Sequence, residues 1–203
     1  MNLALPVPSR HDFQSVIERL RGPAEPFATD DDGPRAAVAA VLRRGVDDAE
    51  LLFIRRADRE GDPWSGHMAF PGGRRDPRDR SLLETALRET REEVGLDLSK
   101  AGSVVVRLPD VQAYARGRPA NLLVASFVFA IEGTHALAPN EEVAEALWVP
   151  LGPIVRGDGA KPFDYRHEGI TYKLPSLDMG GRIVWGLTYR MLEALTEKLH
   201  RVP

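Results

Sequence analysis

The sequence contains no cysteine among its 203 residues. It can therefore form no disulfide, and it has no thiolate to serve as a metal ligand, a covalent nucleophile or a redox switch. A chain without disulfides suits a reducing compartment, so we expect a cytoplasmic location.

An excess of charge of one sign is also missing. The 27 basic and 30 acidic side chains leave a formal net charge of −3, so no overall field would attract nucleic acid or anionic lipid. No segment approaches 18 uninterrupted apolar residues, and residues 1–8 lack a basic stretch followed by a long apolar run. We therefore expect neither a standard secretion signal nor a membrane span, and a small molecule as the partner.

With 43% hydrophobic and 28% charged residues, the composition is that of a globular protein with one core. A chain of this length can bury roughly 70% of the surface that it exposes when unfolded. We expect residues 35–203 to form the domain, ending in a helix over 184–200 with Trp185 on its apolar side. Residues 1–34 should add a helix over 10–21, capped by Ser9 and Asp12, and a proline-rich acidic connection.

The periodicity of the remaining chain predicts a mixed sheet flanked by helices. Residues 35–43 and 51–57 favour a hairpin, and 58–80 favour a loop. Ser81 and Glu84 form a capping-box pattern before a helix that should stop at Gly95. Further strands are expected at 103–108, 111–115, 122–131 and 146–151. Residues 152–183 are the least informative segment and could form a hairpin near the site.

Three carboxylates share one stripe of the helix that follows Ser81. At about 100° per residue, Glu89, Glu92 and Glu93 lie close together, whereas Leu83, Leu87, Thr90 and Val94 form a separate apolar face. We expect the apolar face to pack on the sheet and the acidic stripe to stay open. Such a stripe offers hard oxygen ligands to Mg²⁺ or Mn²⁺; the alternative is a solvated face paired with Arg88.

The surroundings of the acidic stripe favour the metal site. Gly72-Gly73 precedes a run from Arg88 to Leu96 that reads Arg-Glu-Thr-Arg-Glu-Glu-Val-Gly-Leu. This run resembles the Nudix box, with Thr90 in an apolar slot. The upstream part departs from the pattern, because Gly73 lies fifteen residues before Arg88 instead of fourteen. Arg80 stands where the first glutamate belongs, and Asp79 is the nearest acid.

The lengthened box is similar to that of the coenzyme A pyrophosphatase branch of the family. Shared positions are Phe70-Pro71-Gly72-Gly73, Asp76, Asp79 and Thr85-Ala86-Leu87-Arg88-Glu89, with Leu51, Leu52, Arg55, Ala57 and Gly66 upstream. Similar stretches occur late in the chain at 147–151 and 185–188. Phe53 and Asp62 depart from the branch, since threonine and arginine are usual there.

The resemblance implies the Nudix fold, an α/β protein of the α+β type in which helices sandwich a mixed sheet. It also implies metal-dependent hydrolysis of a nucleoside diphosphate derivative, most simply coenzyme A giving 3′,5′-ADP and 4′-phosphopantetheine. By position, Glu89, Glu92, Glu93 and the Gly73 carbonyl would hold Mg²⁺ or Mn²⁺, and Arg88 would orient the carboxylates. A homodimer is compatible with the resemblance and with the frequency of symmetric dimers.

Two alternatives in different classes stay open. One is an enzyme acting on another nucleoside diphosphate derivative, such as ADP-ribose, a dinucleotide or a modified nucleoside triphosphate. The other is a Nudix-like module that senses a nucleotide without turning it over. The three retained acids argue against the sensor, since binding alone does not need an uncompensated carboxylate cluster.

The remaining assignments are less specific. Glu92 or Glu93 could act as general base, or else Glu141 or Glu142 in the loop at 139–143, where a plain polar turn is an equal interpretation. Candidate phosphate ligands are Arg55, for which a surface ion pair is an equal alternative, and Arg59. Phe70 and Trp64 could stack on a base or pack the loop, and His67 is expected to be a hydrogen-bonding or solvent-exposed residue of the loop rather than a catalyst.

Overall fold

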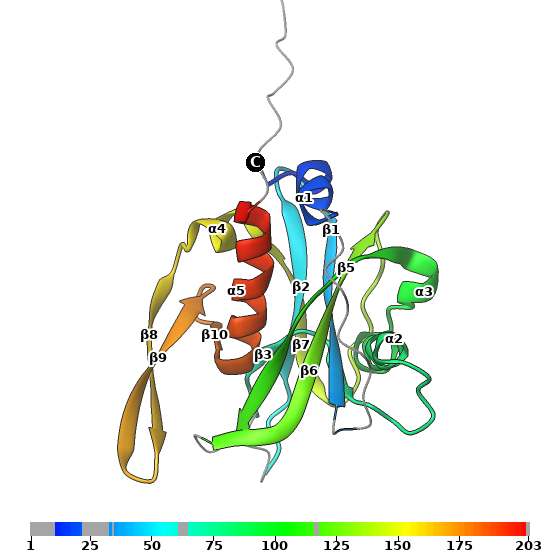
Figure 1. Ribbon diagram of the computed structural model, residues 1–203. Helices are drawn as coiled ribbons and strands as arrows, with labels where there is room; N and C mark the ends of the chain where they lie inside the picture. Colours follow the sequence, from blue (N-terminus) through cyan, green and yellow to red (C-terminus); the bar gives the residue numbers. More distant parts are fainter. Residues whose placement is uncertain (1–10, 22–32, 34, 61–64, 116–117, 202–203) are drawn as a thin grey trace, which may run out of the picture.

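The computed structural model describes residues 11–21, 33, 35–60, 65–115 and 118–201 (Figure 1). Its central sheet is mixed. β1 (Arg35–Arg44) pairs antiparallel with β2 (Ala49–Arg56) and parallel with β6 (Arg118–Ile131), which pairs antiparallel with β5 (Gly102–Ala115). Three further strands complete it: β3 (Met68–Ala69) and β7 (Val143–Pro150) on β2, and β4 (Gly72–Arg74) on β1.

β1 lies at the centre of the sheet because its side chains are apolar on both faces. Val38, Ala40 and Leu42 belong to one buried cluster, and Ala37, Ala39 and Val41 belong to the other. This is the pattern of a strand covered on both sides. The hairpin predicted from residues 35–57 is confirmed by the register, in which Leu42 faces Leu51.

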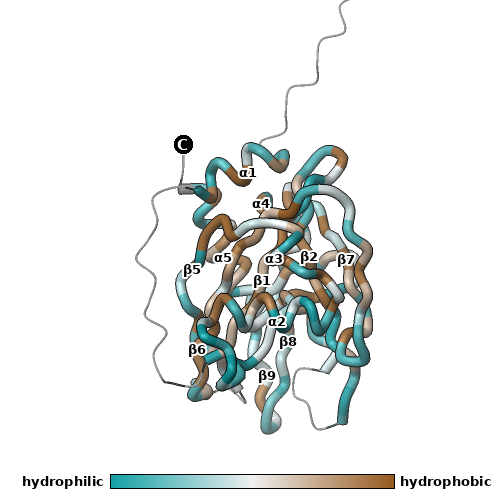
Figure 2. The backbone as a smooth tube through the Cα atoms, turned by 90° about the vertical axis from the view of Figure 1, so that its right-hand side faces the viewer, coloured by the Kyte–Doolittle hydropathy of each residue, from teal (hydrophilic) through white to brown (hydrophobic). Residues whose placement is uncertain are grey.

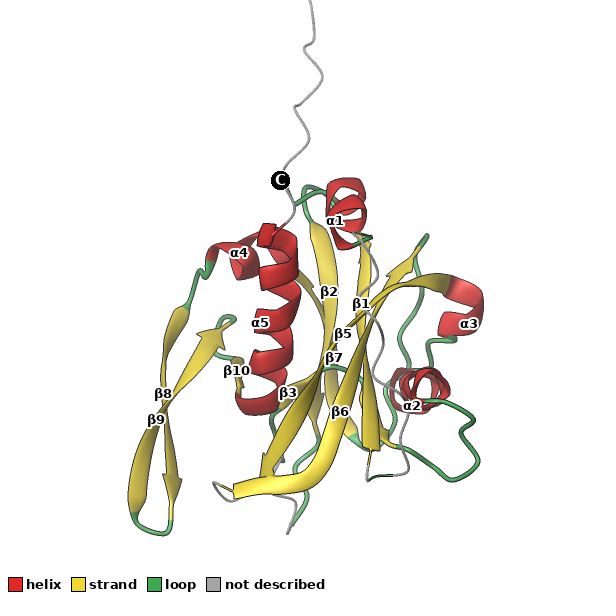
Figure 3. Cartoon of the chain, viewed as in Figure 1, coloured by secondary structure: helices red, strands yellow, loops and turns green. Residues whose placement is uncertain are grey.

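Helices cover both faces of the sheet, as Figure 3 shows. The first cluster holds α1 (Phe13–Leu20), α4 (Leu151–Arg156) and α5 (Gly186–Arg201) on one face; the second holds α2 (Leu82–Val94) and α3 (Leu98–Ala101) on the other. Figure 2 shows hydrophobic stretches running through the central strands. The expected sandwich of helices around a mixed sheet is confirmed.

A second, smaller sheet stands at the side of the molecule in Figure 1. It consists of β8 (Ala160–His167), β9 (Ile170–Asp178) and β10 (Ile183–Trp185), all antiparallel. Glu168 and Gly169 connect β8 to β9 with φ angles of 49° and 78°, as a tight hairpin turn between twisted strands requires. The hairpin suggested for residues 152–183 is therefore present.

The structure corrects several expected boundaries. The first helix begins at Phe13, because Asp12 is itself the N-cap and accepts a 3.1 Å hydrogen bond from the Ser15 amide; Ser9 lies outside the described residues. The expected loop at 58–80 contains β3 and β4, since the chain around Gly72 pairs with β1. Strands expected at 103–108 and 111–115 form one strand, β5, whose register shifts between them. Trp185 ends β10 instead of lying in the last helix.

α1 contacts α5, β1, β2 and β5, so the helix before residue 22 packs on the rest of the chain. The assignment of 1–34 as an appended segment and 35–203 as the domain stays a prediction.

We predict that Gly95→Ala destabilises the protein more than Gly133→Ala. Both glycines have positive φ angles, 72° and 75°, so alanine costs about 1–2 kcal/mol at either position. At Gly95 an added Cβ would also come within 3.0 Å of the Ala138 side chain, whereas it would meet nothing within 4 Å at Gly133. Urea unfolding measures both free energies; equal losses would contradict the packing argument.

Candidate active site

α2 carries the predicted acidic residues, and both of its ends are capped. The Ser81 hydroxyl accepts a hydrogen bond from the Glu84 amide at 3.2 Å, and Gly95 ends the helix in the left-handed conformation. The capping box is only half formed, since the Glu84 carboxylate accepts from the Arg80 amide one residue earlier. The predicted helix is confirmed, and its last two turns hold Glu89, Glu92 and Glu93.

Glu93 is buried, with 3% of its surface exposed, so the expectation of an entirely open acidic stripe is wrong. On the helix, Glu93 lies between the directions of Leu82 and Ala86, which both pack on the sheet. The face that packs is therefore centred on Leu82, Ala86, Thr90 and Val94, and Leu83 and Leu87 are only partly buried.

The Glu93 carboxylate is satisfied by backbone. The Gly72 amide donates a 2.8 Å hydrogen bond to its Oε2. The pKa of Glu93 is raised to about 7, chiefly by burial; the charges of Glu89 and Glu142 also raise it, whereas the Gly72 amide and the Arg56 charge lower it. Glu93 therefore titrates near neutral pH.

Glu89 fills the space that the second glycine leaves open. A Cβ on Gly73 would lie 2.5 Å from the Glu89 carboxyl carbon. Burial is the main cause that raises the pKa of Glu89, and hydrogen bonding to Arg88 opposes it. Because β4 pairs with β1 here, the glycine pair brings bare backbone against two carboxylates. Gly73 thus lies beside Glu89, and a metal-binding role for its carbonyl stays a prediction.

Arg88 connects the carboxylates of the helix to the preceding loop. Its Nη1 donates to Glu89 at 2.8 Å and to Glu92 at 3.0 Å. Its Nε and Nη2 donate to the two Asp79 oxygens at 3.0 and 2.9 Å. The Asp79 bonds are the main cause that raises the pKa of Arg88, and Arg88 lowers the pKa of Asp79 in return.

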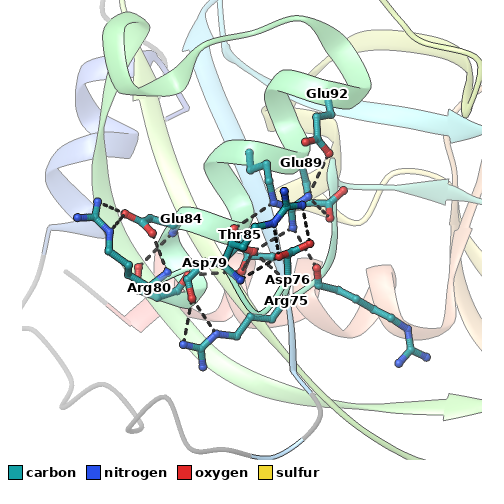
Figure 4. A network of polar contacts seen from close by, with 12 residues as sticks. Arg75, Asp76, Asp79, Arg80, Glu84, Thr85, Glu89 and Glu92 are labelled. Carbon is teal, nitrogen blue, oxygen red and sulfur yellow. Dashed lines mark hydrogen bonds and ion pairs between the residues drawn. The ribbon is translucent and has the colours of Figure 1, made fainter.

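Asp79 is the acid nearest to the position of the first glutamate of the Nudix box, which Arg80 occupies in this chain. The Asp79 side chain is 7% exposed and also accepts a hydrogen bond from the Thr85 hydroxyl at 2.9 Å. Figure 4 shows Asp79 inside a polar network that extends to Arg75 on one side and to Glu89 and Glu92 on the other. Arg80, which occupies the expected glutamate position, pairs with Glu84 at the surface instead.

The loop before β7 brings another acid to this site. The Ala57 amide donates to the Glu142 carbonyl at 2.8 Å, and the Asn140 amide donates to the Glu93 carbonyl at 2.9 Å. The Glu142 charge contributes to the raised pKa of both Glu89 and Glu93. Glu141, in contrast, has a side chain that is 91% exposed. Of the two glutamates considered in this loop, Glu142 lies by the helix.

The two candidate phosphate ligands, Arg59 and Arg55, lie on different sides of the sheet. Arg59 pairs with Glu142 at 3.0 Å, at the edge of the acidic site. Arg55 follows Phe53 in β2 and shares its face, because side chains alternate along a strand; Phe53 packs in the cluster that includes α5. Arg55 therefore faces away from α2, where its Nη1 lies 3.6 Å from Asp58.

The structure contradicts a stacking role for Phe70. Its ring is 2% exposed and lies 5.1 Å from that of Phe53, so it packs the loop onto the core. His67 makes an edge contact with Trp185 at 4.7 Å. No sequence pattern predicts this contact, because no periodicity links a loop histidine to a tryptophan more than a hundred residues away. Asp62 and Trp64 lie outside the described residues.

The donor chemistry fits a hard divalent cation. The glutamate oxygens and the Gly73 carbonyl are all oxygen ligands, and burial raises the pKa of both Glu89 and Glu93 in the metal-free protein, so that a bound cation would favour their ionised forms. Within the described residues, however, no three acidic or histidine side chains already converge as a metal-holding group. Glu89 and Glu92 are turned to Arg88, and Glu93 to Gly72, so binding requires these side chains to reorient.

Comparisons with known proteins agree with this arrangement. A family model described as the NUDIX domain matches residues 33–169. The chain is 36% identical over 172 residues to the mitochondrial coenzyme A diphosphatase NUDT8 of Mus musculus, covering 81% of this chain and 79% of that protein. It is 43% identical over 108 residues to an uncharacterized Schizosaccharomyces pombe protein, covering 52% of this chain but only 33% of that protein.

Among solved structures, a Caenorhabditis elegans Ap4A hydrolase in a binary complex matches with a TM-score of 0.50 and 19% identity, over 61% of this chain and 84% of that one. At this identity the match shows the fold alone. Across the described residues, no helix has the length and apolar character needed to cross a membrane.

We predict that Gly73→Ala reduces turnover while the protein stays folded. The new methyl group would displace the Glu89 carboxylate, and a displacement of about 1 Å can cost on the order of 10²-fold in rate. Gly72→Ala is the contrasting variant, because its φ of 152° and its closeness to the Val38 backbone make the change destabilising. Thermal unfolding and kcat should be measured on both variants. A loss of stability in Gly73→Ala as large as that in Gly72→Ala would contradict the prediction.

We also predict that the metal-free protein loses stability as the pH rises from about 4.5 to about 7. In this window Glu93 ionises readily in the unfolded chain, whereas burial keeps it protonated in the folded one. The raised folded pKa therefore favours folding below the window, and this contribution is lost above it, roughly 2–4 kcal/mol in total. In Glu93→Gln this group does not titrate, so its free energy of unfolding, measured with urea in EDTA, should change less with pH than that of the parent. Parallel pH dependences of the two proteins would refute the assignment.

Proposed function

The chain belongs to the Nudix family of diphosphohydrolases, and we propose that it hydrolyses the diphosphate of coenzyme A or an acyl derivative. The products would be 3′,5′-ADP and 4′-phosphopantetheine or its acyl form. The observation that carries a hydrolytic function is the row of Glu89, Glu92 and Glu93 on α2, two of which, Glu89 and Glu93, lie against the Gly72-Gly73 backbone. The similarity to the mouse coenzyme A diphosphatase supports the choice of substrate.

Nudix hydrolases generally use divalent metal ions, and we assign Glu89, Glu92, Glu93 and the Gly73 carbonyl to hold Mg²⁺ or Mn²⁺. When bound, such an ion withdraws charge from the phosphates and lowers the pKa of water. Asp79 fixes Arg88, and Arg88 in turn holds Glu89 and Glu92 in place. The protein's part is therefore to position carboxylates around one reacting diphosphate.

Hydrolysis also needs a group that accepts a proton. The water oxygen bonds to phosphorus, the bond between that phosphorus and the bridging oxygen breaks, and the water proton passes to a base. Glu93 is our first candidate, because its carboxylate is held by the Gly72 amide beside the other acids and burial raises its pKa in the metal-free protein. Glu142 is the second, since it lies beside Glu89 and Glu93 and is paired only with Arg59 among the contacts described.

A cytoplasmic location and a homodimer stay predictions. The name of the mouse relative places that protein in mitochondria.

The test is a turnover assay with Mg²⁺ or Mn²⁺ over coenzyme A, acetyl-coenzyme A, ADP-ribose, a dinucleotide and a modified nucleoside triphosphate. We expect coenzyme A to have the highest kcat/KM. Glu93→Gln should lower kcat by about 10²–10⁴-fold, the usual contribution of a positioned acid or base. Glu84→Gln is the matched control on the same helix and should leave kcat unchanged, because Glu84 contacts Arg80 at the surface.

The outcomes separate the alternatives. If ADP-ribose is consumed and coenzyme A is not, the substrate assignment fails and the hydrolase assignment holds. If nucleotides bind to the parent protein and to Glu93→Gln equally and none is consumed, the chain is a nucleotide sensor.

A further inference from the structure

A cluster of aromatic rings lines one face of the small sheet. The Trp185 ring centroid lies 4.7 Å from that of Phe163, 5.1 Å from that of Tyr165 and 4.7 Å from that of His67. Tyr172 faces Tyr165 in the strand register, with a ring distance of 6.4 Å. The rings of Phe163 and Tyr165 are tilted by only 30° and 37° from that of Trp185. They therefore form a continuous aromatic surface.

These rings are not part of the hydrophobic core. Phe163, Tyr165 and Trp185 are only half-buried, and Tyr172 is 41% exposed. The buried cluster nearest to them takes in Leu177 and Val184 but none of these rings. An aromatic cluster that served only to hold the hairpin would be expected to bury its rings as Phe53 and Phe70 are buried. The aromatic cluster of the small sheet therefore keeps part of its ring surface accessible to solvent.

The aromatic surface adjoins the acidic site around the end of β2. The Arg56 amide donates to the His67 carbonyl at 3.0 Å, and the Arg56 charge acts on the pKa of Glu93. The preceding residue, Arg55, lies on the opposite face of the sheet beside Glu145, to which Arg182 in the turn between β9 and β10 donates at 3.0 Å. Arg55 and the rings therefore share the face that leads away from the carboxylates.

We propose that Tyr165, Tyr172 and Trp185 bind the purine base of the nucleotide, with Arg55 contacting a phosphate between the base and the acidic site. This rests on the proposed function and adds where the nucleoside half of the substrate lies. A base fits this surface because its flat π-face stacks on aromatic rings. An arginine beside the stack provides a charged donor for the phosphate that a nucleotide carries.

The experiment measures binding of AMP, which has the base but no diphosphate to hydrolyse, and of ribose 5-phosphate, which has no base. Both are titrated without metal against the full chain. We expect AMP to bind more tightly than ribose 5-phosphate. Tyr165→Ala and Tyr172→Ala should each weaken AMP binding by about ten-fold, as loss of a stacking ring does. Tyr165→Phe keeps the ring and should stay within about two-fold of the parent.

Thr171→Ala is the matched control, because Thr171 is exposed and, one residue from Tyr172, lies on the other face of β9. A second measurement covers the case in which an alanine variant unfolds the hairpin. AMP should quench tryptophan emission in the parent, and the quench should disappear in Trp185→Phe. Equal affinity for AMP and ribose 5-phosphate, or AMP binding unaffected by Tyr165→Ala and Tyr172→Ala in folded protein, would overturn the proposal.

Failure of this proposal is distinguishable from failure of the proposed function. If AMP binding depends on the rings but coenzyme A is not hydrolysed, the base site holds and the substrate assignment fails. If coenzyme A is hydrolysed with the same KM in the parent, Tyr165→Ala and Tyr172→Ala, the enzyme is correctly assigned and its base binds elsewhere.

Discussion

The contact between α2 and the Gly72-Gly73 backbone is the constraint on which the site depends. It places a carboxylate, Glu93, in the interior with a backbone amide as its partner. Burying a carboxylate is costly, and the cost appears as a pKa raised to about 7. A side chain at Gly73 would displace Glu89. The main role of the two glycines is therefore to leave room, by having no side chain, for the carboxylates of Glu89 and Glu93 against the sheet.

The Arg88–Asp79 pair shows how a change of loop length is absorbed. The segment between Gly73 and Arg88 is one residue longer than in the usual Nudix box, and the acid nearest to the position of its first glutamate is the shorter Asp79. Asp79 nevertheless accepts from both Nε and Nη2 of the Arg88 guanidinium, and the Thr85 hydroxyl of α2 donates to the same carboxylate. A buried carboxylate thereby holds the arginine that holds Glu89 and Glu92, so the geometry of the site extends beyond the residues that face it.

Sequence patterns predicted the elements whose signals are local. The hairpin at 35–57 and the helix between Ser81 and Gly95 follow from periodicity and capping, and the three glutamates follow from spacing. Patterns failed where long-range packing decides. Glu93 is buried because of what α2 packs against, Phe70 is core because it meets Phe53, and Trp185 leaves the last helix because it pairs with Ser176 in β9. The pairs Arg88–Asp79 and Arg59–Glu142 depend on the paths of two loops, which sequence patterns do not give.

The end of β2 also gives the proposed nucleotide site two sides. Successive side chains of a strand point to opposite faces, so Arg56 acts on Glu93 while Arg55 lies with Glu145 and the small sheet. The diphosphate and the rest of a nucleotide need not share one face of the sheet. A substrate that bends around the strand end would meet carboxylates on the α2 side and an arginine with aromatic rings on the α5 side. Specificity can therefore change through β8 and β9 while the acids of α2 stay the same.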